Sequence, residues 1–250
     1  MTDSTRPDPR LDIVHEDGRL LVLNKQADLV CHPTKTDAWS SLIGRVRLHL
    51  GETATAHMLN RLDRETTGLV IVAKDDDLAR AIRKIWERRE VVKEYQAIVH
   101  GWPTKESDLI EGPLGKDENS PVAIKDCVRP DGSPSQTGYE VARRFERAEG
   151  KFALLNVTPR SGRKHQIRIH LAHIGHPIVG DKLYGYDEDC YLALVERRLT
   201  DGQRQKLILS NHALHAGCLR FRVANEDFEF NADPDATFSG FLGGVEVRLT

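Results

Sequence analysis

Residues 60–73 read NRLDRETTGLVIVA and join a charged loop to an apolar segment. The segment 67–73 carries no charge and directly follows the polar stretch, which is typical of a buried strand. The loop therefore offers charges at the edge of a predicted sheet, and these belong to Arg61, Asp63, Arg64 and Glu65. Taken alone, the loop is better explained as a surface ion-pair cluster than as a catalytic site, so the rest of the sequence must decide.

The remaining segments predict an α+β fold around this strand. Strands are predicted where apolar residues form short runs or alternate with polar ones: 20–24, 67–73, 91–101, 139–145 and 152–157. Helices are predicted where apolar residues recur at helical spacing: 39–50, 78–86 and 164–175. The intervening 103–134 is rich in glycine, proline and serine, which favours loops and short strands. Because no regular βαβ alternation is present, we expect a central, mainly antiparallel mixed sheet flanked by helices and loops.

Length and composition fit one catalytic domain over residues 11–250, preceded by a loose tail at 1–10. Of the 250 residues, 39% are apolar and 30% are charged, as in ordinary globular proteins. No run of about 18 apolar residues is present, and the N-terminus lacks the apolar core of a signal peptide. We therefore expect a cytoplasmic protein that does not enter a membrane.

The cysteines and histidines do not predict a metal site. The four cysteines lie far apart and form no CxxC pair, so we expect them to be reduced and structural: Cys31, Cys127, Cys190 and Cys218. The histidines at 165, 170, 173 and 176 lack the spacing and the matching acid of a zinc helix. Asp75 to Asp77 are read as the cap of the following helix rather than as ligands.

Charge is distributed unevenly along the chain, although the net charge is only −2. Between residues 141 and 182 there are nine Lys or Arg against three Asp or Glu, whereas residues 224–250 hold one Arg against six acids. A basic middle is what a phosphate-facing surface requires; the alternative is a solvated face without a ligand. Residues 162–170, GRKHQIRIH, gather cations and imidazoles around a predicted helix start, where anions are favoured.

These segments together resemble the RluA-type pseudouridine synthases. Arg61-Leu-Asp63 followed by Thr66-Thr-Gly-Leu69 is similar to the family motif HRLDxxTSGL. Residues 162–171, continuing through Gly180-Asp181 to Tyr184-Gly185, are similar to its second long signature. Shorter similarities, in the order of the family, are the opening NKPAGLxxHP at 21–33, KxYxA at Lys93-Glu-Tyr95, and LHAxxL at Leu214-His-Ala216. The resemblance spans about residues 20–221 and implies the pseudouridine synthase fold.

The chain departs from the family pattern at positions that carry no reacting group. Asn60 replaces the usual His, Thr67 the usual Ser, and Gln26 and Asp28 the Pro and Gly of the opening motif. Asn211 stands where Arg is common, and Val223-Ala224 where His-Pro is common. These changes bear on substrate contacts rather than on chemistry.

The resemblance implies isomerisation of uridine in RNA without a cofactor or a metal. Asp63 would be the catalytic carboxylate, acting either as nucleophile or as sugar deprotonator. Tyr95 would stack on the uracil and move the proton at C5, the alternative being a core tyrosine. Arg168 would pair with Asp63 and keep it ionised.

The implied partner is structured RNA, either transfer RNA or ribosomal RNA, bound by a monomer without an obligate protein partner. Arg61 resembles the residue that enters the RNA when the target base leaves its stack. The other expected RNA contacts are Arg64, Arg163, Lys164 and His165. The family often carries an N-terminal S4 domain, but the opening motif begins near residue 20, so none is expected and transfer RNA is slightly favoured.

Two other functions compete with this one. A silent RNA-binding or RNA-chaperone protein of the same fold would not need Asp63 and Tyr95. A base-excising glycosidase would normally need two carboxylates flanking the bond, and Glu65 is the only acid close to Asp63. Excision changes the mass of the RNA, whereas isomerisation does not.

Overall fold

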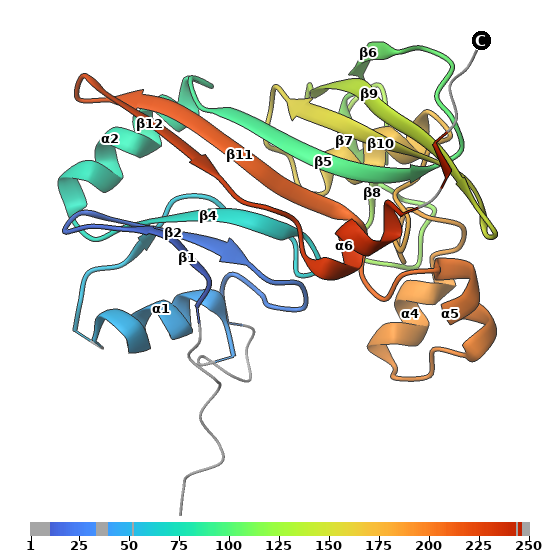
Figure 1. Cartoon of the computed structure of the whole chain (residues 1–250), viewed down its shortest axis with the longest axis horizontal. Coiled ribbons are helices and arrows are strands. Elements are labelled where there is room, and N and C mark those ends of the chain that lie inside the picture. The colour runs from blue at the N-terminus through green and yellow to red at the C-terminus, as the bar shows by residue number, and fades with distance from the viewer. Residues whose placement is uncertain (1–10, 34–39, 52, 244, 247–250) are drawn as a thin grey trace, which may run out of the picture. The chain divides into compact units, whose positions relative to one another are not determined.

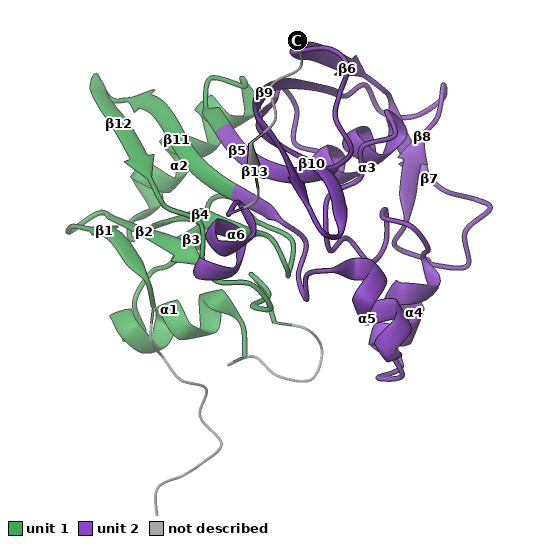
Figure 2. Ribbon diagram, turned by 45° about the vertical axis from the view of Figure 1, so that its right-hand side comes forward, with its two compact units in different colours: residues 1–93, 216–235 green, residues 94–215, 236–250 purple. Residues whose placement is uncertain are grey.

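The computed structural model describes residues 11–33, 40–51, 53–243 and 245–246. The predicted tail at 1–10 and the first residue of the predicted helix, Trp39, lie outside the described residues. The chain divides into two compact units (Figure 2). Unit 1 comprises Met1–Lys93 and Ala216–Asp235, and unit 2 comprises Glu94–His215 and Ala236–Thr250. The prediction of one domain over 11–250 stays a prediction.

Unit 1 is built on an antiparallel sheet with two helices (Figure 1). Its strands are β1 (Ile13–Glu16), β2 (Leu20–Lys25), β3 (His57–Met58), β4 (Thr67–Ala73), most of β11 (Leu214–Val223) and β12 (Glu226–Asn231). Its helices are α1 (Leu42–Leu50) and α2 (Asp76–Glu87). The strand order is β1-β2-β4-β11, with β3 on β4 and β12 on β11. The pairs β1–β2, β2–β4, β3–β4 and β11–β12 are antiparallel.

The core of unit 1 confirms the predicted buried strands. Every residue of β4 is buried, and β2 is buried except at Asn24. The predicted aspartate cap of helix α2 is confirmed, because the Asp75 carboxylate accepts a hydrogen bond from the Leu78 amide at 2.7 Å; the helix begins at Asp76, two residues before its predicted start. Its apolar face packs against the sheet through Leu78, Ala79, Ile82 and Ile85.

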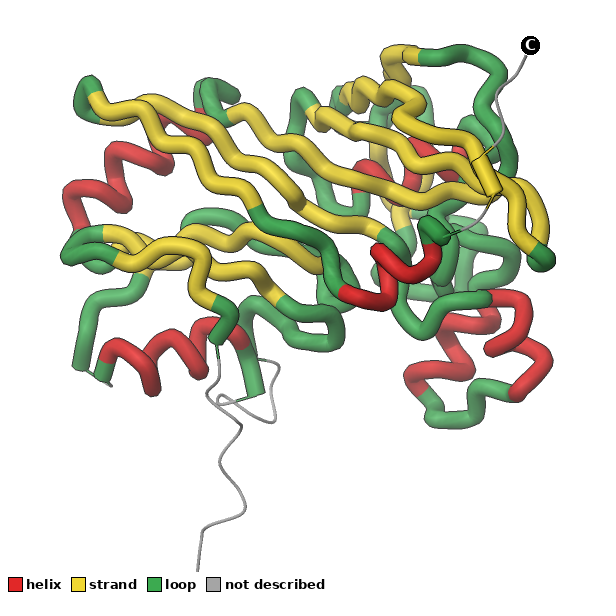
Figure 3. The backbone as a smooth tube through the Cα atoms, viewed as in Figure 1, coloured by secondary structure: helices red, strands yellow, loops and turns green. Residues whose placement is uncertain are grey.

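Unit 2 contains antiparallel strands, a small separate hairpin and most of the short helices (Figure 3). Its strands are most of β5 (Val92–His100), β6 (Ser107–Glu111), β7 (Leu114–Lys116), β8 (Asp126–Val128), β9 (Gln136–Arg147), β10 (Gly150–Pro159) and β13 (Val245–Glu246). Its helices are α3 (Gln166–His173), α4 (Asp189–Val195), α5 (Asp201–Leu207) and α6 (Ala236–Phe241). The order is β5-β10-β9-β13 with β6 on β9, while β7 and β8 pair separately.

The predicted strands of unit 2 are present, and β9 and β10 are longer than predicted. Phe145 and Phe152 are fully buried and lie opposite each other in this hairpin. The expected short strands in 103–134 are β6, β7 and β8. The elements that were not predicted are helices α4, α5 and α6 and strands β1, β3, β11, β12 and β13. Together with unit 1, these elements confirm an α+β fold with mainly antiparallel strands.

Two glycines are required by close approach of the backbone. A side chain on Gly68, whose φ is 112°, would lie 2.3 Å from the Ala216 carbonyl oxygen. A side chain on Gly180, whose φ is 81°, would lie 2.4 Å from the Asn211 carbonyl oxygen. The late LHA motif therefore supplies, in Ala216, the backbone against which β4 begins.

All four cysteines are free thiols, as predicted, and only Cys127 is not buried. Within the ranges that the structure describes, no helix is both long and apolar enough to cross a membrane.

Candidate functional site

The Asp63 loop lies between β3 and β4 in unit 1, and the Asn60 side chain fixes its start. The Asn60 amide donates to the Leu69 carbonyl at 2.9 Å and accepts from the Ile71 amide at 2.8 Å. It thereby continues the pairing of β3 on β4 with side-chain atoms. Asparagine in place of the usual histidine therefore keeps the loop anchored to the strand.

Below the loop lies Lys25, whose side chain is 1% exposed. Its ammonium group donates to the carbonyls of Gln26, Leu29 and Arg64 at 2.8, 3.0 and 3.0 Å. Burial lowers the pKa of Lys25 to about 8, and the nearby negative charge of Asp63 acts in the opposite direction. Lys25 thus holds the backbone beside Asp63 and keeps a positive charge near its carboxylate at neutral pH.

The opening motif contacts this loop at two further points. Cys31 makes a reciprocal pair with the Leu62 backbone, accepting from its amide at 3.4 Å and donating to its carbonyl at 3.5 Å. Asp28 lies 3.6 Å from the Arg64 guanidinium, and both side chains are exposed. The φ of Asp28 is 62°, a left-handed conformation that Asp tolerates better than most residues. This explains how Asp can replace the usual glycine there.

In unit 2, Arg168 lies in helix α3, and a buried carboxylate fixes its guanidinium. Its Nε and Nη2 donate to the two oxygens of Asp181 at 2.7 and 2.9 Å, and both residues are buried. Burial alone would raise the pKa of Asp181, but the Arg168 guanidinium outweighs it and holds this pKa well below its usual range. The bidentate pair fixes the plane of the guanidinium, so Nη1 points away from Asp181.

A tyrosine joins Arg168 to two of the predicted RNA contacts. The Arg168 guanidinium lies 5.0 Å from the centroid of the Tyr184 ring. The Tyr184 hydroxyl accepts from the Asp126 amide at 3.2 Å and lies 2.9 Å from Nδ1 of His165. Lys164 in turn pairs with the Asp126 carboxylate at 2.9 Å. Lys164, His165 and Arg168 therefore form one network in this unit.

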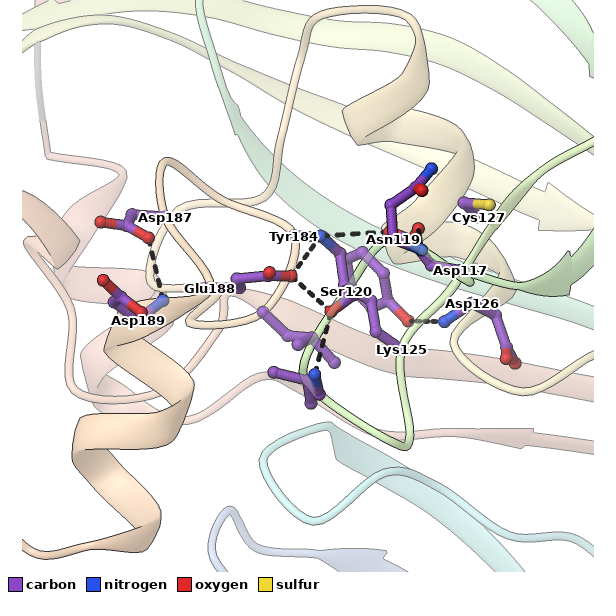
Figure 4. Close-up of polar contacts among 12 residues, drawn as sticks. Asp117, Asn119, Ser120, Lys125, Asp126, Cys127, Tyr184, Asp187, Glu188 and Asp189 are labelled. Carbon is purple, nitrogen blue, oxygen red and sulfur yellow. Dashed lines mark hydrogen bonds and ion pairs between the residues drawn. The ribbon is translucent and has the colours of Figure 1, made fainter.

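The loop between β7 and β8 is fastened to the same network (Figure 4). Glu188 accepts from Lys125 at 2.6 Å and from the Ser120 hydroxyl at 2.7 Å. These bonds fix the end of the loop, and the residue that follows it, Asp126, donates its backbone amide to the Tyr184 hydroxyl. The segment around Lys164 is thus supported by elements that precede and follow it in the sequence.

Tyr95, Arg61 and Arg163 complete the predicted set. Tyr95 lies in β5 opposite Val157, is half-buried and packs partly on the core of unit 2. Arg61 and Arg163 are exposed. Asp63 belongs to unit 1, and Tyr95 and Arg168 to unit 2, so the pairing of Asp63 with Arg168 stays a prediction.

Most cations of the basic middle are occupied within unit 2. Seven of the nine contact another described residue through a hydrogen bond, an ion pair or a ring: Arg143, Arg144, Arg147, Lys151, Lys164, Arg168 and Lys182. Of the predicted phosphate-facing cations, the two outside this list are Arg160 and Arg163, and both are exposed.

The histidines of this region also have structural partners. His170 is fully buried between the Thr137 hydroxyl and the Gly112 carbonyl, at 2.8 Å from each. His176 lies 2.9 Å from the His100 carbonyl. In the described part of the chain, no three His, Cys, Asp or Glu side chains gather as metal ligands.

Comparison with known proteins places the Asp63 loop and the segment around Arg168 in one family pattern. Residues 19–173 match the sequence pattern of RNA pseudouridylate synthases. The chain belongs to this family. The membership confirms the resemblance to RluA-type pseudouridine synthases that the motifs predicted.

Relatives and solved structures agree with this membership. Ribosomal large subunit pseudouridine synthase D of Vibrio cholerae is 32% identical over 232 residues, covering 89% of this chain and 67% of the relative. The Pasteurella multocida protein of the same name is 34% identical over 189 residues, covering 73% and 56%. The chain thus spans between about half and two thirds of the length of these relatives.

Two human structures share the fold. Human RNA pseudouridylate synthase domain containing 1 superposes with a TM-score of 0.76 at 23% identity, covering 98% of this chain and 93% of that chain. Human RNA pseudouridylate synthase domain containing 4 gives 0.70 at 26% identity, covering 92% and 91%.

The sequence reasoning missed the residues that hold the predicted ones in place. Asp181 and Tyr184 occur in the second signature, but neither periodicity nor charge gave them a role. Lys25 ends an apolar strand, and a lysine at the end of a buried run is the signal that could have singled it out. In this family member, Lys25 and Asp181 are the clearest supporting residues.

Proposed function

We propose that this protein is an RNA pseudouridine synthase that isomerises uridine in structured RNA, with Asp63 as the catalytic carboxylate. The proposal rests on one observation above the others: the Arg61-Leu-Asp63 loop of a family member is anchored on β4 by Asn60 and carries a partly exposed carboxylate. The Asp63 carboxylate is therefore held on a fixed backbone and remains accessible to a base or a sugar.

The proposed reaction conserves every atom of the uridine. The bond between N1 and C1′ breaks, the uracil turns, and C5 bonds to C1′. C5 then loses its proton, and N1 ends with one. Asp63 would act either by attacking C1′ or by removing a proton from the sugar, and a carboxylate suits both roles.

Tyr95 and Arg168 would serve this step from unit 2. Tyr95 offers a half-buried ring for stacking and a phenol for the C5 proton. Arg168 would pair with Asp63 through Nη1, because the Asp181 fork uses Nε and Nη2. Arg61, Arg64, Arg163, Lys164 and His165 would hold the RNA, with Arg61 occupying the stack that the uridine leaves.

The names of the relatives support a choice of substrate to test first. Both relatives described above are named for the ribosomal large subunit, so ribosomal RNA is the first substrate to test and transfer RNA the second. We also propose that the protein works as a cytoplasmic monomer.

Asp63→Asn tests the proposal, because it removes a carboxylate and changes few contacts. We expect it to abolish pseudouridine formation, measured by carbodiimide-dependent primer-extension stops, and to change RNA affinity by only a few fold. Asp28→Asn is the matched control, since Asp28 is also an acid close to Lys25 and asparagine tolerates its left-handed backbone. Turnover by Asp63→Asn would refute the mechanism.

Mass spectrometry of the treated RNA separates the rival functions. Isomerisation leaves the mass of the RNA unchanged while creating the carbodiimide adduct. Release of free uracil would identify a glycosidase, and binding without either change would identify a silent RNA-binding protein.

A further inference from the structure

Helix α2 in unit 1 presents a row of basic side chains to solvent. Residues 80–89 contain five Lys or Arg and one Glu, a local charge of +4 in a chain whose net charge is −2. All five are exposed: Arg80, Arg83, Lys84, Arg88 and Arg89. We call these five residues the α2 basic face.

The spacing of these residues places most of them on one side of the helix. Arg80, Lys84 and Arg88 follow each other at intervals of four, and Arg83 lies three residues after Arg80. The one acid on this side is Glu87, four residues after Arg83. The opposite side is the buried apolar face. From Arg80 to Arg88 the helix advances about 12 Å, which is long enough to meet several phosphates of one RNA strand.

The α2 basic face differs from other exposed cations in its partners. Elsewhere, exposed basic residues such as Lys105, Arg198 and Arg222 pair with a nearby acid. On α2, Arg80 pairs with Asp77, but within the described ranges no acid lies within salt-bridge distance of the other four. The positive charge of this face is therefore available to an external anion.

The helix dipole explains only part of this arrangement. Cations in the last turn are favoured by the partial negative charge at the helix end, which accounts for Lys84 and Arg88. It does not account for Arg80 and Arg83, which lie earlier, or for Arg89, which lies beyond the helix. Acid–base spacing of four residues accounts for Arg80 (Asp76) and Arg83 (Glu87), but Lys84, Arg88 and Arg89 have no acid four residues away.

We propose that the α2 basic face binds the phosphate backbone of the base-paired stem that flanks the target uridine. This inference rests on the proposed function for the identity of the RNA. Single-stranded RNA is usually bound by exposed aromatic rings, and the only aromatic residue of α2, Trp86, packs against the core of unit 1. A duplex, which offers phosphates and little base surface, fits a face made of charges alone.

The test is a triple substitution, Arg83→Gln with Lys84→Gln and Arg88→Gln. Glutamine keeps helix propensity, so the helix should remain, as circular dichroism and thermal unfolding would verify. The probe is a fluorescent RNA duplex of about 16 base pairs, the length that one double-stranded-RNA module spans. We expect binding to weaken about tenfold at moderate salt, and the slope of log K against log salt to become shallower by about 2.

A matched triple variant controls for bulk charge. Lys105→Gln with Arg198→Gln and Arg222→Gln removes the same charge from residues that are already paired, and should change duplex affinity less than twofold. Equal losses in the two triple variants, or an unchanged slope in the α2 variant, would overturn the proposal.

Turnover distinguishes this proposal from the proposed function. When the substrate is the RNA that the native enzyme converts, the α2 triple variant should have a higher KM and an unchanged kcat, because the face contacts no reacting atom. If the native enzyme makes no pseudouridine but the α2 variant still loses duplex affinity, the proposed function fails and the binding face stands. If pseudouridine forms normally and duplex affinity is unaffected, only the binding face fails.

Discussion

Helices α2 and α3 both carry arginines, but they use them in opposite ways. In α2 the arginines project to solvent and face no described acid except at Arg80. In α3 the arginine is buried and gripped by both oxygens of Asp181. The contrast separates two uses of the same side chain. On α2 the total positive charge of several side chains matters, whereas in α3 the orientation of one planar guanidinium matters.

The difference teaches that basic composition does not locate a basic surface. The stretch 141–182 is the more basic by count, yet most of its cations are occupied by carbonyls, acids or rings. The ten residues 80–89 are a shorter stretch, but they put all their cations outside. The following predictions test whether this distinction holds.

The largest effect is expected from breaking the buried pair in α3. Asp181→Asn leaves the Arg168 guanidinium buried without its counter-charge, which typically costs about 3–5 kcal/mol of unfolding free energy. We expect urea unfolding to show such a loss and pseudouridine formation to fall below detection.

A double variant separates stability from activity at this site. Replacing both partners, Arg168→Met with Asp181→Leu, should recover most of the unfolding free energy, because an apolar pair of similar volume needs no charge balance. Activity should remain lost. Recovery of activity in the double variant would show that the guanidinium has no part in the reaction.

Arg→Lys substitution sharpens the comparison at constant charge. Arg168→Lys keeps the positive charge but cannot form the fork with Asp181, so we expect kcat to fall by about 10- to 100-fold. Arg88→Lys on α2 should change duplex affinity less than twofold. If Arg88→Lys were as damaging as Arg168→Lys, orientation would matter on both helices.

A pH experiment tests the second buried cation, Lys25. In the folded protein the pKa of Lys25 is about 8 because of burial, whereas an unfolded lysine titrates near 10.4. Between these values the unfolded chain binds one more proton, so Lys25 makes the unfolding free energy rise with pH, by up to about 1.4 kcal/mol per pH unit.

Comparison with Lys25→Met isolates this contribution. The unfolding free energy of the native protein minus that of the variant should become more positive as urea unfolding is repeated from pH 8 to pH 10. Other titrating groups are common to both proteins and largely cancel. A difference that stays constant over this range would mean that Lys25 titrates as an ordinary surface lysine.

The smallest effect is expected at Tyr184. Tyr184→Phe keeps the ring beside Arg168 but removes the hydroxyl that meets Asp126 and His165, a loss of about 1 kcal/mol. Removing His165 as well should add little if the two side chains act through one bond. A double-mutant cycle on unfolding free energy measures this coupling.

The sequence predicted the elements whose signal is local. The run 67–73 gave β4 with its bounds because all its residues are buried, and Asp75 marked the start of α2 by its capping side chain. Helix α5 and strand β12 were missed because they are short and mostly exposed, so they leave weak periodicity. Strand β11 was missed although it is long and largely buried, because its cysteine, glycine and arginine residues interrupt the apolar run.

The family motifs predicted which residues belong to the site but not which residues contact them. Asp63 was singled out by its loop, and Arg168 by its signature, but the partner of Arg168 found in unit 2 is Asp181, which no spacing rule pairs with it. Likewise, nothing in the order of residues shows that Lys25 would donate to the Arg64 carbonyl. Contacts between distant segments depend on packing, which periodicity does not encode.

The division of unit 1 into two stretches of chain has a consequence for how the protein is made. Met1–Lys93 leave the ribosome first, but Ala216–Asp235, which complete the unit, emerge only after all of Glu94–His215. The strand that follows the Asp63 loop, β4, has its second residue, Gly68, against the backbone of Ala216. A chain that terminates before Ala216 would therefore pair β4 with β2 and β3 but lack its other neighbour, β11, so the strand behind the Asp63 loop is completed only late in synthesis.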